Sequence, residues 1–188
     1  MCYSKGSRKY HQVPHGFTLI EVIIGIVVFA FSLSIITSLI LPTSTQSANQ
    51  LQQIRAAELG QSLMNEIIGK SFDENSDRVG GVTRCNEPSV AINPCSAVFG
   101  PDADEDSRAD YDDVDDYNGL IESGSDIENI QGQALGRHYQ GFTTEVSVVY
   151  DGNYDGIQDS NQVAKLITIT VTSPAKDPIV FSSYKANF

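Results

Sequence analysis

Glu21 stands at the start of a long apolar stretch, five residues after Gly16. Residues 22–41 contain no charged side chain, and as an α-helix they would extend about 30 Å, the thickness of bilayer hydrocarbon. A charge at the centre of a membrane costs about 2.5–3.5 kcal/mol on insertion scales, so it is retained where it has a partner or a function. We therefore expect Glu21 to be a functional carboxylate. The alternative is an uncleaved signal anchor in which this side chain only reaches toward the membrane surface.

A second candidate site is the segment DGNYDGIQD, residues 151–159. Its side-chain oxygens recur at alternate positions with Gly156 at the turn, which is the spacing that calcium loops use. Gln162 occupies the position where an EF-hand has a bidentate glutamate, so we expect weak affinity and no EF-hand. The alternative is a polar hairpin turn, which Asp-Gly pairs also favour. The predicted Ca²⁺ ligands are Asp151, Asn153, Asp155, the carbonyl of Ile157, and Asp159. No cofactor is predicted to be required.

Residues 102–116 form an acidic run with nine carboxylates and one arginine. Runs of like charge are usually solvated, so we expect a mobile, exposed segment. Binding of calcium and contact with a basic neighbouring subunit are the alternatives.

Two of the three cysteines, Cys85 and Cys95, are separated by nine residues, whereas Cys2 precedes the apolar stretch. If the N-terminal leader is removed, an oxidising compartment would allow a disulfide between Cys85 and Cys95. Two free thiols are the alternative. Zinc is not expected, because His138 is the only histidine after residue 16.

Charge is distributed unevenly along the chain. Lys5, Arg8 and Lys9 precede the apolar stretch, which places the N-terminus in the cytoplasm and the rest outside it. The formal net charge of −12 disfavours a nucleic-acid partner, because phosphates would be repelled. The sequence has no Gly-x-Ser-x-Gly motif, metal-binding histidine pair or phosphate-binding glycine loop, so we expect no enzyme and no catalytic residues.

The segment GFTLIEV, residues 16–22, after a basic leader and before some twenty apolar positions, resembles the N-terminus of type IV pilins and pseudopilins. Residues 55–78 and 111–120 further resemble stretches of minor pilins of MSHA-type pili. The resemblance implies that a prepilin peptidase removes the leader, residues 1–16, and methylates the new amine of Phe17. Glu21 would then be an assembly residue that neutralises this amine. The implied partners are the peptidase, other pilin subunits through the N-terminal helix, and the inner-membrane assembly platform.

The pattern of the remaining chain predicts an α+β fold of the type IV pilin kind. A transmembrane and assembly helix covers residues 17–41, and Pro42 is expected to kink or break it. An amphipathic helix follows at 43–70, with an apolar face that contains Leu51, Ile54, Ala57, Gly60, Leu63, Met64, Ile67 and Ile68. An acidic loop region covers 71–136, and a β-meander at 137–188 contains strands at 142–150, 163–172 and 179–184. We expect the amphipathic helix to pack on this small antiparallel sheet.

Three functions remain open at this point. The first is a minor pilin that resides in the inner membrane as a single-pass protein and then enters a surface filament for adhesion. The second is a minor pseudopilin of a type II secretion system, whose leader has the same pattern. The third is a membrane-anchored calcium-binding adhesive module that never polymerises.

Overall fold

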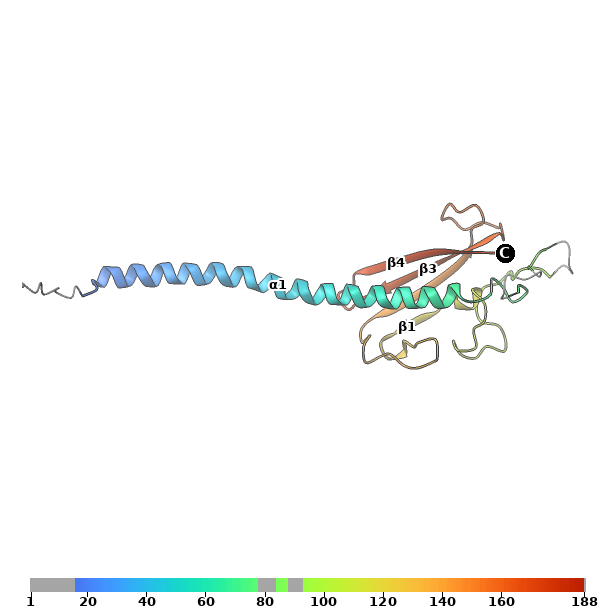
Figure 1. The fold of residues 1–188 in the computed structure, drawn as a ribbon, viewed down its shortest axis with the longest axis horizontal. Helices are drawn as coiled ribbons and strands as arrows, with labels where there is room; N and C mark the ends of the chain where they lie inside the picture. Colours follow the sequence, from blue (N-terminus) through green and yellow to red (C-terminus); the bar gives the residue numbers. More distant parts are fainter. Residues whose placement is uncertain (1–15, 78–83, 88–92, 188) are drawn as a thin grey trace, which may run out of the picture. The chain divides into compact units, whose positions relative to one another are not determined.

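The computed structural model describes residues 16–77, 84–87 and 93–187 (Figure 1). The basic leader residues and Cys2 therefore lie outside the described part. The chain divides into two compact units, Met1–Gln46 and Ser47–Phe188, and we call the second unit the head.

A single helix, α1, runs from Leu19 to Ile68 and contributes to both units. In the first unit, Leu19–Ser38 is long and apolar enough to cross a membrane, and its described side chains are exposed. The helix continues through Pro42, so the break expected after residue 41 is absent, whereas a kink there stays a prediction. In the head, α1 ends two residues before the predicted end at residue 70.

The head contains a four-stranded antiparallel sheet in the order β1-β2-β3-β4. Strands β2 (Thr143–Tyr150), β3 (Ala164–Thr172) and β4 (Pro178–Ala186) form the predicted meander. Strand β1, Ile121–Ser123, was not predicted. It has three residues and its buried residue is the charged Glu122, so it lacks the apolar alternation that marks a strand.

One face of the sheet is buried. Cross-strand pairs such as Val146↔Ile169 and Val148↔Ile167 combine side chains that are at most 2% exposed. The buried residues of this face are Phe142, Thr144, Val146, Val148, Tyr150, Ile167, Ile169 and Val171. Because side chains alternate along a strand, these residues share one face, which is apolar except at Thr144.

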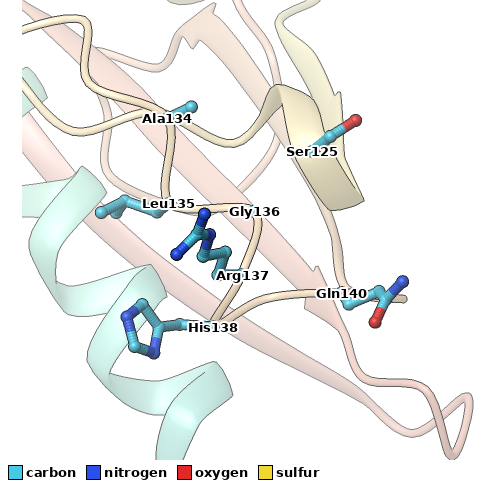
Figure 2. Close-up of a pocket in the computed structure, with 7 residues that line it drawn as sticks. All are labelled: Ser125, Ala134, Leu135, Gly136, Arg137, His138 and Gln140. Atoms are coloured by element: carbon cyan, nitrogen blue, oxygen red, sulfur yellow. The ribbon is translucent and has the colours of Figure 1, made fainter.

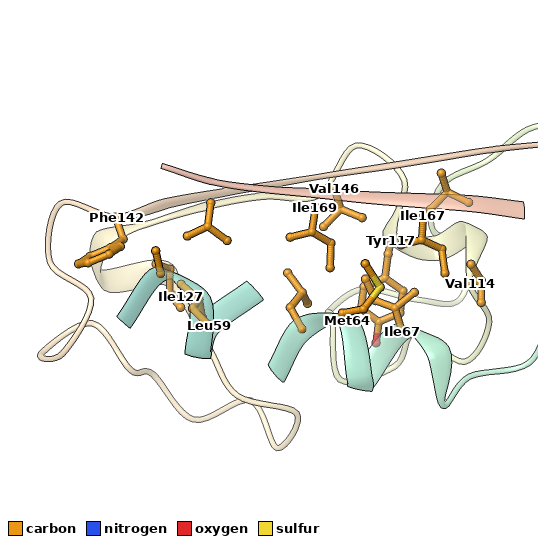
Figure 3. Packing of buried hydrophobic residues seen from close by; sticks show 14 residues of the cluster. Leu59, Met64, Ile67, Val114, Tyr117, Ile127, Phe142, Val146, Ile167 and Ile169 are labelled. Atoms are coloured by element: carbon orange, nitrogen blue, oxygen red, sulfur yellow. The ribbon is translucent and has the colours of Figure 1, made fainter. Parts of the chain in front are cut away.

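The C-terminal part of α1 covers this surface (Figure 3). Its buried apolar residues are Ala56, Leu59, Leu63, Met64 and Ile67. The prediction was wrong at Leu51 and Ile54, which are 51% and 56% exposed, because burial on the helix begins only at Ala56. A side chain at Gly60 would place its Cβ 2.3 Å from the ring of Phe181 on β4. The helix therefore approaches the sheet very closely at this residue.

The segment between α1 and β2 holds short elements instead of one structureless loop. Besides β1, it contains the 3₁₀ turns η1 (Asp115–Tyr117) and η2 (Gly124–Asp126). It also contributes to a second, smaller core made of Phe72, Cys85, Cys95 and Tyr150, with Phe99 packed against it. Cys85 and Cys95 form the expected disulfide within this core.

Candidate functional site

The first candidate site is the start of α1. Gly16 and Phe17 precede the helix and are exposed, Phe17 by 83%. No other part of the described structure comes within 4 Å of the Cβ position of Gly16. The peptide bond between these two residues is therefore accessible and non-helical, as a protease substrate must be.

Thr18 caps this helix, a role that was not predicted. Its carbonyl accepts hydrogen bonds from the amides of Glu21 and Val22, at 3.1 and 3.3 Å, and its Oγ1 accepts from the Glu21 amide at 3.4 Å. The pair Thr18 and Glu21 has the Thr-x-x-Glu spacing of a capping box, which could have been recognised in the sequence. Glu21 thus lies in the first helical turn, where the helix dipole favours a negative charge.

The second candidate site, residues 151–159, connects β2 to β3. Asp151 is fully buried, and its carboxylate accepts hydrogen bonds from the amides of Asp155 (3.2 Å) and Gly156 (2.8 Å). The hydroxyl of Tyr184 on β4 donates a third at 2.6 Å. Burial disfavours the charged form, but these donors outweigh it and hold the pKa of Asp151 below its ordinary value. Asp151 is therefore an anion that the fold positions, and Tyr184 is a partner that the sequence pattern did not identify.

The other predicted ligands stabilise the turn itself. Asn153 Oδ1 accepts from the Asp155 amide at 3.0 Å, and Asp155 Oδ1 accepts from the Ile157 amide at 2.9 Å. Asp159 Oδ1 accepts from the amides of Gly152 and Asn161. These bonds fit a polar turn, and they also leave further oxygen lone pairs free for a cation. Calcium binding here therefore stays a prediction.

Calcium binding predicts a thermal shift that depends on this loop. A site occupied at 100 times its Kd would stabilise the chain by about 2.7 kcal/mol, so millimolar calcium should raise the Tm of the full-length protein in detergent. Asp155→Ala should abolish the increase, since Asp155 is an exposed predicted ligand. Asp104→Ala, which removes an exposed carboxylate of the acidic run, is the matched control and should retain it. An equal calcium-dependent shift in both variants would remove this loop from consideration.

The acidic run does not form one solvated segment. Asp102, Asp104, Asp106 and Asp110 are exposed as expected, but Asp113, Asp115 and Asp116 are at most 4% exposed. The prediction was wrong for these three because the chain turns inward at η1 and at the residues just before it, where the fold supplies buried cations and backbone amides. The Oδ2 atom of Asp116, for example, accepts from the amides of Asp112 and Asp113 at 3.0 and 2.8 Å.

Arg108, the arginine of the run, anchors it to the main core. Its guanidinium binds both carboxylate oxygens of Glu66 on α1, at 3.1 and 2.6 Å, and both of Glu122 on β1, at 2.7 and 2.8 Å. The Tyr117 hydroxyl donates to Glu66 at 2.9 Å. Burial alone would lower the pKa of Arg108, but the two carboxylates raise it. These pairs connect the helix, the loop and the sheet.

Lys165 on β3 is the second buried cation. It is fully buried, and its Nζ donates to Asp115 Oδ1 and to the Phe72 carbonyl, both at 2.5 Å. Asp73 Oδ2 lies 3.4 Å away. The rings of Phe72, Phe99 and Tyr150 surround the amine, with centroids 4.5 to 5.6 Å from Nζ.

Several carboxyl groups near these cations are hard to ionise. Burial, together with the hydrogen bond and negative charge of Asp115, raises the pKa of Asp113 to about 9. Burial raises the pKa of Glu105 to about 7. Glu105 lies beside Asp112 and Asp116, and one carboxylate oxygen from each of the three residues lies within 4.8 Å of the others. A cluster of acids is not in itself a cation site, so calcium binding by the acidic run also stays a prediction.

An open pocket lies between η2 and the loop that leads to β2 (Figure 2). Arg137 and His138 give it a basic character that contrasts with the acidic chain as a whole. The two loops come close together, since a Cβ on Gly136 would lie 2.5 Å from the Cα of Ser125. The lining residues are Ser125, Ala134, Leu135, Gly136, Arg137, His138 and Gln140.

Comparison with known families identifies one match. Residues 14–37 match the prokaryotic N-terminal methylation motif. No curated protein and no solved structure matches the chain. The motif supports a type IV pilin-like or pseudopilin-like precursor, which implies processing by prepilin peptidase. The apolar helix suggests that this precursor is anchored in a membrane. The motif suggests a structural subunit.

Proposed function

We propose that this chain is a minor pilin, a structural subunit that enters or initiates a surface filament used for adhesion. The observation that carries the proposal is the methylation motif at 14–37, combined with an exposed Gly16–Phe17 bond and a carboxylate in the first turn of an apolar helix. These features serve the maturation of a subunit and its packing through the helix.

Cleavage after Gly16 would create a positive charge that needs compensation. The new amine of Phe17 would stand next to the N-terminus of α1, which already carries a partial positive charge. Glu21 lies four residues further on, about one helical turn along the axis. Its carboxylate can therefore pair with the amine of its own chain or with that of a neighbouring subunit when the helices bundle in a low-dielectric filament core.

The assignment to an MSHA-type pilus, with similarity to the MSHA minor pilin MshD, depends on residues 55–78 and 111–120. In the structure, these two stretches supply Glu66 and Tyr117, which are hydrogen-bonded to each other in the core. The resemblance therefore involves residues that contact one another in the head. A type II secretion pseudopilin is the nearest competing function, because its leader would match the same motif.

The N-terminus of the mature protein tests the processing step. Mass spectrometry of the chain purified from membranes should show a first residue of Phe17 that carries one methyl group. Gly16→Val should leave the leader attached, because a β-branched side chain beside the scissile bond obstructs the peptidase. Gly25→Val is the control: it changes a glycine within the apolar stretch, beyond the scissile bond, and should be processed normally. A wild-type chain that retains residues 1–16 would contradict the proposal.

Deletion of the gene separates the two filament systems. Loss of surface filaments and adhesion with normal protein secretion supports the minor pilin. Loss of secreted proteins with intact filaments would assign the chain to the secretion system.

A further inference from the structure

We propose that Lys165 and Asp115 are joined by an amide bond between their side chains. The two groups belong to β3 and η1, fifty residues apart in the sequence, with Nζ 2.5 Å from Oδ1. The side chain of Lys165 is 0% exposed and that of Asp115 is 4% exposed. The inference concerns the head alone and is independent of which filament, if any, the chain enters.

The surroundings of the amine favour condensation over a permanent ion pair. Three aromatic rings enclose Nζ and keep water away from it. Separate charges are costly in such an environment, whereas an amide is neutral and needs only ordinary hydrogen bonds. Holding two reacting groups in contact can replace a reactant concentration on the order of 10⁵ M or more. A dry, pre-positioned pair can therefore form a bond that would not form in water.

The structure also selects which carboxylate reacts. Both oxygens of Asp73 accept backbone amides, Oδ1 from Asn75 at 3.1 Å and Oδ2 from Ser96 at 2.8 Å. Asp73 is therefore held in place and stands farther from Nζ, at 3.4 Å. The carbonyl of Phe72 accepts a second hydrogen of Nζ and orients the amine toward Asp115. Lys70 and Lys185, by contrast, donate to the backbone carbonyls of Tyr111 and Ile68.

The reaction is a condensation that needs no oxidant, reductant or other reactant. Nζ attacks Cγ of Asp115, the Cγ–N bond forms, one Cγ–O bond breaks, and the oxygen leaves as water. The ammonium of Lys165 carries three protons and must lose one before Nζ can attack; two of the three leave with an oxygen of Asp115 as water, and the third stays on the amide nitrogen. Asp113 shares a side-chain hydrogen bond with Asp115 and is buried beside it. It can donate its proton to the leaving oxygen and regain one from Nζ.

The high pKa of Asp113, about 9, supports this relay. A carboxyl group that remains protonated at neutral pH can act as a general acid. Asp113 is therefore the proton donor, while Asp73 and the Phe72 carbonyl are positioning groups.

Peptide mass spectrometry of the full chain tests the bond. The protein is purified in detergent, its disulfide is reduced and alkylated, and it is digested with trypsin. A linked chain should give the peptide 109–137 attached to 138–176, lighter than their sum by one water, with no cleavage after Lys165. Separate peptides 109–137, 138–165 and 166–176 in the wild-type protein would overturn the proposal.

Three variants test the chemistry, and two of them, Asp115→Asn and Asp113→Ala, retain the amine of Lys165. Asp115→Asn should give a linked product identical in mass to the wild-type product, because its amide would lose ammonia where the acid loses water. Asp113→Ala should slow linkage after refolding by roughly 10²-fold, as removal of a general acid does. Lys165→Met should yield no linked peptide, whether or not it folds. A linkage rate in Asp113→Ala equal to that of the wild type would overturn the role given to Asp113.

Discussion

Glu21→Ala is expected to abolish incorporation into filaments while leaving maturation intact. The variant should still begin at a methylated Phe17, because the cleaved bond lies outside the helix. In the packed filament, however, the amine would lose its counter-charge, and a buried unpaired charge costs about 3–5 kcal/mol. That cost corresponds to roughly a 10²- to 4 × 10³-fold decrease in incorporation at about 1.4 kcal/mol per factor of ten. The ratio of subunit in sheared filaments to subunit in membranes, measured by quantitative immunoblotting, gives the effect.

Glu58→Ala provides the matched control, because it removes an exposed carboxylate from the same helix within the head. This variant should enter filaments as the wild type does. If Glu21→Ala were incorporated as efficiently as Glu58→Ala, the neutralising role of Glu21 would be refuted. An unchanged Glu21→Ala phenotype would also favour the anchored module that never polymerises.

The largest expected effect on stability belongs to Arg108→Ala. This substitution leaves the buried carboxylates of Glu66 and Glu122 without their cation, although their side chains are only 5% and 9% exposed. Removing one partner of a buried ion pair typically costs about 3–5 kcal/mol, because an uncompensated charge remains. We expect a decrease of that size in the free energy of unfolding, measured by denaturant titration of the full-length protein in detergent.

Arg84→Ala is the control for the loss of an arginine as such. Arg84 forms an exposed pair with Glu87 at 3.8 Å, and exposed pairs contribute about 0–1 kcal/mol. A double variant, Arg108→Ala with Glu66→Gln, should recover part of the loss, since it also removes one stranded charge. Equal destabilisation by Arg84→Ala and Arg108→Ala would show that the buried network contributes little.

The parts of the fold that were predictable are those whose signal is local. Strands β2 and β3 were both predicted, because they alternate apolar and polar residues over eight and nine positions, and one face of each is buried. Gly16, Phe17 and Glu21 form a linear motif, and the resemblance to type IV pilins that this motif carries implied the candidate processing site. The Thr18 cap has an equally local signal, the Thr-x-x-Glu spacing, and was overlooked.

What could not be predicted depends on contacts between distant residues. Leu51 and Ile54 continue the helical period of the buried residues, and periodicity cannot show where the covering sheet ends. Likewise, composition indicates a solvated acidic run, whereas burial of Asp115 depends on Lys165, fifty residues away. Strand β1 could not be predicted for the same reason. Its buried residue is the charged Glu122, and the partner that allows this burial, Arg108, belongs to another segment.

The contact between Gly60 and Phe181 limits which sequences this fold can accept. Because the aromatic ring occupies the space where a side chain of residue 60 would begin, the two positions share one fixed volume. A bulkier residue on the helix would require a smaller one on β4. In related chains that keep the same distance between the helix and the sheet, a larger side chain at one of these two positions should therefore be accompanied by a smaller one at the other.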